Sequence, residues 1–196
     1  MCEATDIGGD SQIYDYEGLV VVKNKVKAGT VKGNELIPFT AAIYANAKLG
    51  KSNLNRQYTG EYEVITDFAQ AELTKLKKAG KFVYHSVGDT VRVLEDINGL
   101  ITTTSTKGAE FKDNQVVRIL DALAIADARV FNEMYVGKVN IDTAGKESYL
   151  NKIIDVREEF LKEGALKDYD KESIEIVEIN DEDVRGAVKV DSDRKS

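Results

Sequence analysis

The chain has 196 residues, with 27 Lys and Arg against 34 Asp and Glu, so its formal net charge is −7. A hydrophobic fraction of 42% and a charged fraction of 31% are typical of a globular protein. The acidic balance argues against nucleic acid as the main partner, because phosphate binding favours a basic face. The single Cys2 and the single His85 exclude an internal disulfide and a zinc site built on several cysteines or histidines.

Neither a membrane span nor a secretion signal is predicted. No run of 18 apolar residues occurs in the chain. The N-terminus lacks the basic segment and the apolar run of a signal peptide. We therefore expect no membrane partner.

The first predicted elements are a strand, a helix and a second short strand. Residues 1–12 are polar and predict a flexible N-terminus, and the apolar run 19–22 predicts a buried strand. Pro38 is typical of a first helical turn, where its missing N–H has no helical partner to lose, so we expect a helix over 38–48. Residues 62–65 predict a short strand.

The middle of the chain predicts a helix and a hairpin. Asp67 is a candidate cap for a helix whose last turn is rich in lysine and which ends at Gly80. Two runs with apolar and β-branched residues, 82–87 and 91–94, are separated by a Gly-Asp turn and predict a β-hairpin. Residues 100–104 are expected to extend a strand.

Two long amphipathic helices dominate the second half, at about 114–135 and 146–163. Their apolar residues fall three or four positions apart and define one face of each helix. A half-solvated strand at 174–179 and a last strand at 184–190 follow. Strands and helices mix without strict βαβ alternation, so the predicted fold class is α+β: a mixed sheet packed with two long amphipathic helices.

Patterns that would carry chemistry fail at specific positions. Residues 50–52, Gly-Lys-Ser, match the end of a phosphate-binding loop, but Ala45 stands where that loop requires glycine. Residues 168–172 match the start of a calcium loop, but Ser173 replaces its glycine and Ile179 its bidentate acid. We therefore predict no catalytic residue, no metal ligand and no cofactor-binding residue.

The remaining charged and titratable groups leave two interpretations each. His85 and Ser86 are neighbours on a predicted strand and point to opposite faces, so they cannot form a catalytic pair. His85 is a surface or partly buried strand residue or, as the less favoured alternative, acts in catalysis with a distant serine. The acidic segment 168–183 is a solvated edge or, as the less favoured alternative, the site of a metal-dependent enzyme. One basic cluster consists of Lys75, Lys77, Lys78 and Lys81. These lysines either interact with the dipole at the end of a helix or contact an acidic partner.

Seven short segments, taken in order, resemble a known family. The segments are Asp15-Tyr16-Glu17-Gly18-Leu19-Val20, Gly80-Lys81-Phe82-Val83-Tyr84, Val91-Arg92-Val93-Leu94-Glu95-Asp96-Ile97-Asn98, Lys107-Gly108-Ala109-Glu110-Phe111-Lys112-Asp113-Asn114, Val117-Arg118-Ile119-Leu120-Asp121, Tyr135-Val136-Gly137-Lys138-Val139-Asn140 and Leu161-Lys162-Glu163-Gly164-Ala165-Leu166. Their order and spacing over residues 15–190 resemble the C-terminal domain of contractile tail sheath proteins from Gram-positive myophages, prophages and phage-tail-like bacteriocins of the R type.

The resemblance implies a structural protein and not an enzyme. Sheath subunits of this family polymerise as stacked hexameric rings around an inner tube and contract to drive that tube through a cell envelope. They join by exchanging terminal strands, which is strand addition at a sheet edge. The implied partners are other sheath subunits and the inner tail tube protein, and neither nucleic acid nor membrane. A tail-assembly binding module is the alternative.

The resemblance also implies a location and a domain organisation. The location is a virion tail or a phage-tail-like particle that is assembled in the cytoplasm of the host bacterium. The expected organisation is a flexible N-terminus at 1–12, a single sheath core domain at 13–190 and a polar tail at 191–196. Because family members extend further on both sides, we expect this chain to be a fragment of a longer one and mainly monomeric in isolation.

Tube contact is expected on the polar faces of the two long helices. The cations that line this region are Lys138, Lys146, Lys152, Arg157 and Lys162. An acidic tube surface would attract them. The alternative is a solvated helix face, in which Glu158, Glu159 and Glu163 balance these charges.

Overall fold

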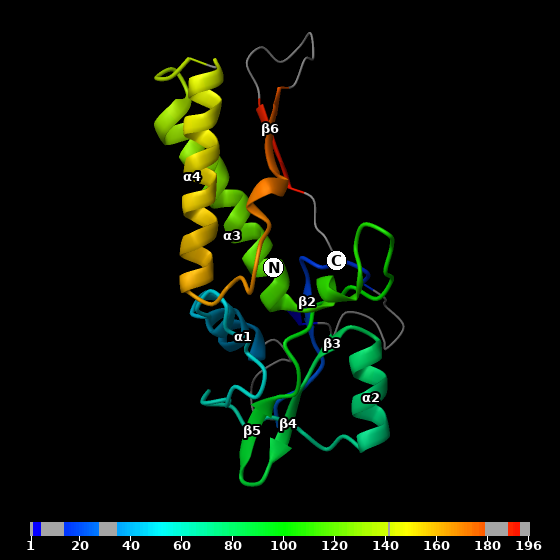
Figure 1. Cartoon of the computed structure of the whole chain (residues 1–196). Helices are drawn as coiled ribbons and strands as arrows, with labels where there is room; N and C mark the ends of the chain where they lie inside the picture. The colour runs from blue at the N-terminus through cyan, green and yellow to red at the C-terminus, as the bar shows by residue number, and fades with distance from the viewer. Residues whose placement is uncertain (1, 5–13, 28–34, 141, 179–187, 193–196) are drawn as a thin grey trace. The chain divides into compact units, whose positions relative to one another are not determined.

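The computed structural model of the protein describes residues 2–4, 14–27, 35–140, 142–178 and 188–192 (Figure 1). The chain divides into two compact units, Met1–Arg118 (the N-terminal unit) and Ile119–Ser196 (the C-terminal unit). Both contain helices and short strands, so the predicted α+β class is confirmed. The single core domain over 13–190 stays a prediction, because compactness alone does not decide whether the two units fold separately.

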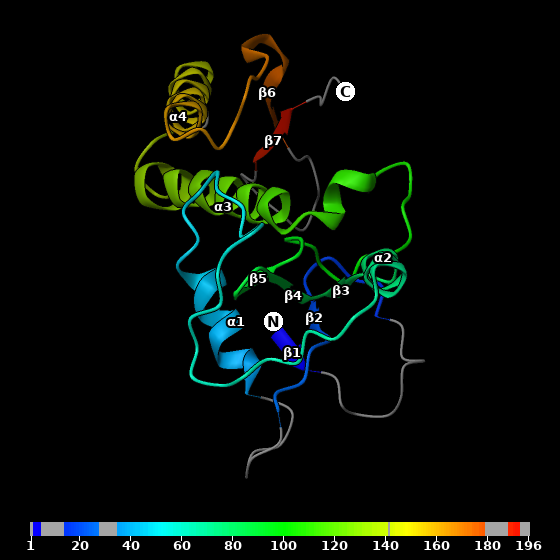
Figure 2. The same ribbon diagram turned by 90° about the horizontal axis from the view of Figure 1, so that it is seen from below.

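Three short parallel strands form the sheet of the N-terminal unit. They are β1 (Cys2–Ala4), β2 (Val20–Val22) and β3 (Lys81–Phe82), in the spatial order β1-β2-β3 (Figure 2). All three valines of β2 are buried, as expected of a central strand with both faces covered. The strand β1 lies within residues 1–12, for which the polar composition predicts a flexible terminus.

Two helices and a hairpin complete the regular structure of this unit. The helix α1 (Leu36–Ala45) holds Pro38 in its first turn, as predicted. The helix α2 (Gln70–Lys78) ends in the predicted lysines. The strands β4 (Tyr84–Val87) and β5 (Thr90–Val93) form the predicted antiparallel hairpin.

Two local predictions before α2 are wrong. Asp67 does not cap this helix, because Ala69 is the N-cap residue and no side chain accepts a hydrogen bond there. The strand expected at 62–65 is reduced to a single antiparallel bridge between Val64 and Val26. One bridge does not extend into a ladder, so these residues remain loop.

The strand expected at 100–104 is also absent. The amide N–H groups of Ile101 and Thr102 donate to Oδ1 of Asp15, at 2.6 and 3.0 Å. A side-chain carboxylate therefore satisfies the backbone donors that a neighbouring strand would otherwise bind.

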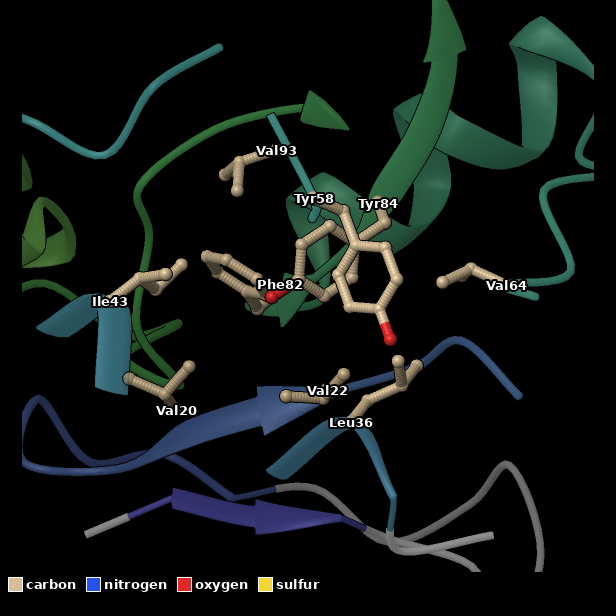
Figure 3. Packing of buried hydrophobic residues seen from close by; sticks show 9 residues of the cluster. All are labelled: Val20, Val22, Leu36, Ile43, Tyr58, Val64, Phe82, Tyr84 and Val93. Atoms are coloured by element: carbon tan, nitrogen blue, oxygen red, sulfur yellow. The ribbon is translucent and has the colours of Figure 1, made fainter. Parts of the chain in front are cut away.

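The core of the N-terminal unit is a single cluster of apolar side chains (Figure 3). Its buried members are Val20, Val22, Leu36, Ile43, Tyr58, Val64, Phe82, Tyr84 and Val93. The ring of Tyr84 meets those of Phe82 and Tyr58 edge to face, with centroids 5.3 and 5.6 Å apart. The buried Tyr84 hydroxyl is hydrogen-bonded to Oγ1 of Thr40 at 2.8 Å, so it is satisfied without water.

The two long helices predicted for the second half are confirmed. The helix α3 (Asn114–Val130) continues through a π-helical turn (Phe131–Tyr135), and α4 (Thr143–Lys162) follows. The helix α4 begins earlier than predicted because Asp142 caps it: its Oδ1 accepts from the N–H of Gly145 at 2.8 Å.

An apolar cluster and a buried ion pair hold the C-terminal unit together. The cluster includes Ile153, which is 0% exposed, and the rings of Tyr135 and Tyr149. Arg157 on α4 is 9% exposed, and its Nη1 and Nη2 donate to the two carboxylate oxygens of Asp127 on α3 at 2.5 and 2.6 Å. This two-point contact fixes α4 against α3 within the unit.

A two-stranded antiparallel ribbon ends the described structure. It pairs β6 (Ile174–Glu178) with β7 (Val188–Ser192) (Figure 1). In this pairing Ile176 lies opposite Val190. Both strands match predicted ones in part, and β7 extends into the predicted polar tail. The remainder of the two predictions, at 179–187, falls outside the described residues.

A buried carboxylate connects three segments of the N-terminal unit. Asp96 is 3% exposed, and its Oδ1 accepts from the hydroxyl of Tyr44 at 2.6 Å. Its Oδ2 accepts from the backbone N–H of Asn53 at 2.8 Å. Asn114 and Arg118, in the first turn of α3, place a side-chain amide 3.3 Å from Oδ1 and a guanidinium nitrogen 3.5 Å from Oδ2. The buried charge is therefore compensated from several sides.

We predict that Ile153→Ala destabilises the protein by about 2–5 kcal/mol, because it removes a fully buried side chain and leaves a cavity. Urea unfolding measures this change. Ile125→Ala is the matched control: Ile125 is 69% exposed on α3 of the same unit, and its truncation should change stability by less than about 0.5 kcal/mol. Equal effects of the two substitutions would contradict the assignment of the core face.

Asp96→Asn should destabilise the protein by about 1–3 kcal/mol, because the amide nitrogen would face donors that now bind a carboxylate oxygen. The midpoint of urea unfolding gives the measurement. Asp89→Asn, in the exposed turn between β4 and β5, makes the same chemical change without buried donors and should leave the midpoint unchanged. An unchanged midpoint for Asp96→Asn would show that the carboxylate does not hold these segments.

Candidate functional site: surfaces for assembly

The β6–β7 ribbon presents two strand edges that a further strand can extend. Within the described residues, each strand pairs only with the other. A two-stranded ribbon is marginally stable in water by itself, and its outer edges carry backbone groups without a strand partner. Ile174 anchors the ribbon, because it is buried in the cluster that contains Ile153. The ribbon is thus held at its start and remains open to strand addition.

Exposed apolar side chains gather between residues 125 and 139 of the C-terminal unit. They are Ile125, Met134, Val136 and Val139. The last three lie in or just after the π-helical turn, a rare conformation that is frequent at functional sites. Exposed apolar groups of this kind are typical of surfaces that contact another protein.

The five cations predicted to contact the tube are not equivalent. Arg157 is buried and bound to Asp127, so its contacts are structural. Lys138 donates to the backbone oxygen of Glu133 at 2.5 Å.

The three lysines of α4 differ in their surroundings. Lys152 forms an ion pair with Asp155 at 2.9 Å, Lys146 is half-buried, and Lys162 is exposed in the last turn of the helix. At about 100° per residue, these lysines project in three directions around the helix. The structure therefore does not gather them on one face.

The basic cluster around α2 is partly neutralised. Lys77 forms an ion pair with Glu95, and Lys81 lies over the ring of Tyr14, with its nitrogen 5.6 Å from the centroid. Lys75 and Lys78 are exposed in the last turn of α2, where cations interact favourably with the helix dipole. This arrangement agrees with the helix-end interpretation.

The titratable groups singled out in the sequence do not form a catalytic arrangement. His85 lies on β4 opposite Arg92, and burial lowers the pKa of His85. The hydroxyl of Ser86 donates to the backbone oxygen of Gly88 at 3.2 Å, in the hairpin turn.

The described ranges contain neither a metal-binding cluster nor a membrane-spanning helix. There, no group of three or more His, Cys, Asp or Glu side chains is placed to hold a metal ion. In the same part of the chain, no helix combines the length and the apolar character that crossing a bilayer requires.

Periodicity alone does not predict which apolar side chains are exposed. Ile125 lies in an amphipathic helix, where an isoleucine is normally expected on the buried face. The available signal is its position: it falls outside the three-and-four spacing that connects Ile119, Leu123 and Val130. Leu54, which is 56% exposed, gives no comparable signal because it lies in a loop.

Family models match nearly the whole chain. The phage tail sheath protein central domain matches residues 3–99, and the phage tail sheath C-terminal domain matches residues 106–195. The resemblance to sheath proteins is therefore confirmed, and it includes the central domain in addition to the C-terminal domain that the sequence segments indicate.

Curated relatives come from Bacillus subtilis strain 168. The phage-like element PBSX protein XkdK is 30% identical over 114 residues, and the uncharacterized protein YqbK is 30% identical over 116 residues. Each match covers 56% of this chain and 24% of the relative. The chain thus spans about a quarter of the length of these relatives.

Solved structures with the same fold are sheath proteins. The sheath tail protein of Desulfitobacterium hafniense is 24% identical, with a TM-score of 0.74 over 83% of this chain and 39% of its own. The helical sheath of the anti-feeding prophage in its contracted state is 14% identical, with a TM-score of 0.72 over 100% of this chain and 58% of its own. With both family models matched and this fold shared, the chain belongs to the phage tail sheath protein family.

Proposed function

We propose that this chain is part of a structural subunit of a contractile tail sheath. The subunit polymerises as stacked hexameric rings around an inner tube and contracts to drive that tube through a cell envelope. The observation that carries the proposal is the β6–β7 ribbon, whose outer edges have no strand partner within the described residues. The two family models and the likeness to a contracted helical sheath support the same function.

Strand addition suits a subunit that must stay connected while it moves. An added strand binds through main-chain hydrogen bonds, which depend little on side-chain identity. The ribbon extends beyond the anchored Ile174, so it can keep a neighbour's strand while whole subunits change their packing. Contraction then requires two arrangements of subunits and no change of fold within each one.

The proposed partners are further copies of the sheath subunit and the inner tail tube protein. The exposed Lys138 and Lys162, together with Lys152, are the cations best placed to meet an acidic tube. Exposed ion pairs contribute little individually, but their repetition along a helical array adds up. The location is a virion tail or a tail-like particle, assembled in the host cytoplasm, and the subunit performs no enzymatic step.

Production of the protein together with the inner tube protein of its particle should give helical sheaths that contain this chain. Electron microscopy and mass spectrometry of pelleted particles provide the readout. One-to-one binding to the tube protein without polymer would instead favour a tail-assembly binding module. Absence of the chain from particles would contradict both functions.

Reversing the charge of selected lysines should show which of them contact the tube. Lys152→Glu combined with Lys162→Glu should weaken co-sedimentation of the sheath with the tube by about 0.2–1 kcal/mol per contact, and most strongly at low salt. Lys75→Glu, at the end of α2, is the control with an equal charge change per site. If the control weakens co-sedimentation as much, the tube does not bind α4.

A further inference from the structure

The loop at residues 50–57, here called the Leu54 turn, is held in place although it lies at the surface. The N–H of Asn53 donates to Asp96 at 2.8 Å, and the N–H of Asn55 donates to the backbone oxygen of Val93 at 3.0 Å. The backbone oxygen of Lys51 accepts from Arg118 at 2.8 Å. Contacts to other segments therefore help to fix the turn, in addition to hydrogen bonds within it such as that from the N–H of Arg56 to the backbone oxygen of Asn53.

This rigid support presents an apolar side chain to solvent. Leu54 is 56% exposed, and its backbone N–H donates to the hydroxyl of Ser52 at 3.1 Å. The next residue, Asn55, has a φ of 59°, a left-handed conformation that Asn tolerates better than most residues. A backbone that is already held in position loses little entropy on binding, which favours the use of Leu54 as an anchor.

The charge around the Leu54 turn is positive, against the balance of the whole chain. Residues 36–60 contain Lys48, Lys51 and Arg56 and no Asp or Glu. Lys48 and Lys51 are exposed, and neither forms an ion pair within the described residues. An apolar side chain that follows two such cations in the chain fits a partner with an acidic surface.

The same chain carries such a surface in its other unit. Within the described residues, 155–178 contain 9 acidic and 4 basic residues, so their formal charge is 4 − 9 = −5. Glu172, in the short helical turn before β6, and Glu175, in β6, are exposed and form no ion pair within the described part of the chain. Every copy therefore carries both the basic Leu54 turn and an acidic surface of complementary charge.

We propose that the Leu54 turn of one copy docks on the acidic surface around Glu172 and Glu175 of a second copy. This inference rests on the proposed function and deepens it, because it names a surface by which sheath subunits meet. The two surfaces differ, so the contact is heterologous: repeated, it builds a ring or a helical array and not a closed two-fold dimer. The contact is separate from strand addition at the ribbon edges.

Carbodiimide cross-linking of a mixture of ¹⁵N-labelled and unlabelled chains tests the contact in solution at low salt. The reagent joins a lysine amine to a carboxylate that touches it, and peptides with mixed labels identify links between copies. We expect links from Lys51 to Glu172 or Glu175. Lys51→Arg, which keeps the charge and removes the amine, should abolish the links from position 51 and spare those from Lys48.

Leu54→Asp should lower the yield of these links by about fivefold or more, because it replaces the anchor with a charge that repels the acidic surface. Val87→Asp is the matched control, since Val87 is another exposed apolar side chain of the same unit. It should leave the yield unchanged. The urea midpoint of each variant shows that it is folded.

Three outcomes would overturn the inference. They are mixed-label links that avoid residues 168–178, links found only within one chain, and links from the Leu54 turn only to the tube protein in tail particles. Because the assay needs no polymer, its result is independent of the proposed function. Sheaths that form without this link would refute the contact alone, and a link without sheaths would refute the function alone.

Discussion

The buried carboxylate of Asp96 is the constraint on which much of the N-terminal unit depends. A charge removed from water is tolerated only where donors surround it, and here the donors come from α1, from the loop after it and from the first turn of α3. Their arrangement therefore follows from one electrostatic requirement. The same requirement fixes the Leu54 turn, so the surface proposed for docking depends on a group that no partner touches.

The sequence predicts well what depends on local pattern. The apolar spacing along α3 and α4 defines both helices, and the glycine-containing turn defines the β4–β5 hairpin. A buried polar group leaves no such pattern. Asn24, for example, is 4% exposed and donates to the backbone oxygens of Ile65 and Tyr84, which lie far from it in the chain. Nothing near position 24 indicates this role.

The candidate site residues also divide into those that a local sequence pattern predicts and those that depend on contacts with distant residues. The sequence locates Lys138, Lys152 and Lys162 on or near the long helices, but burial of Arg157 depends on a carboxylate of α3 that helical spacing within α4 cannot reveal. The exposure of Leu54 likewise depends on its tethers and not on its neighbours in sequence. Charge segregation between residues 36–60 and 155–178 is visible in the sequence, but the structure shows which of these charges form ion pairs within the described residues.

The parallel sheet has a consequence for the order of folding. Its central strand β2 pairs with β3 through Val21 and Lys81, so the loop between them must close before the sheet can form. By contrast, α3 and α4 follow each other directly, and their contacts are closer in sequence. Contacts between distant residues slow folding. In refolding of the whole chain we therefore expect the N-terminal sheet to form after the α3–α4 pair, whereas during synthesis β2 can pair with β3 only after α1 and α2 have been made.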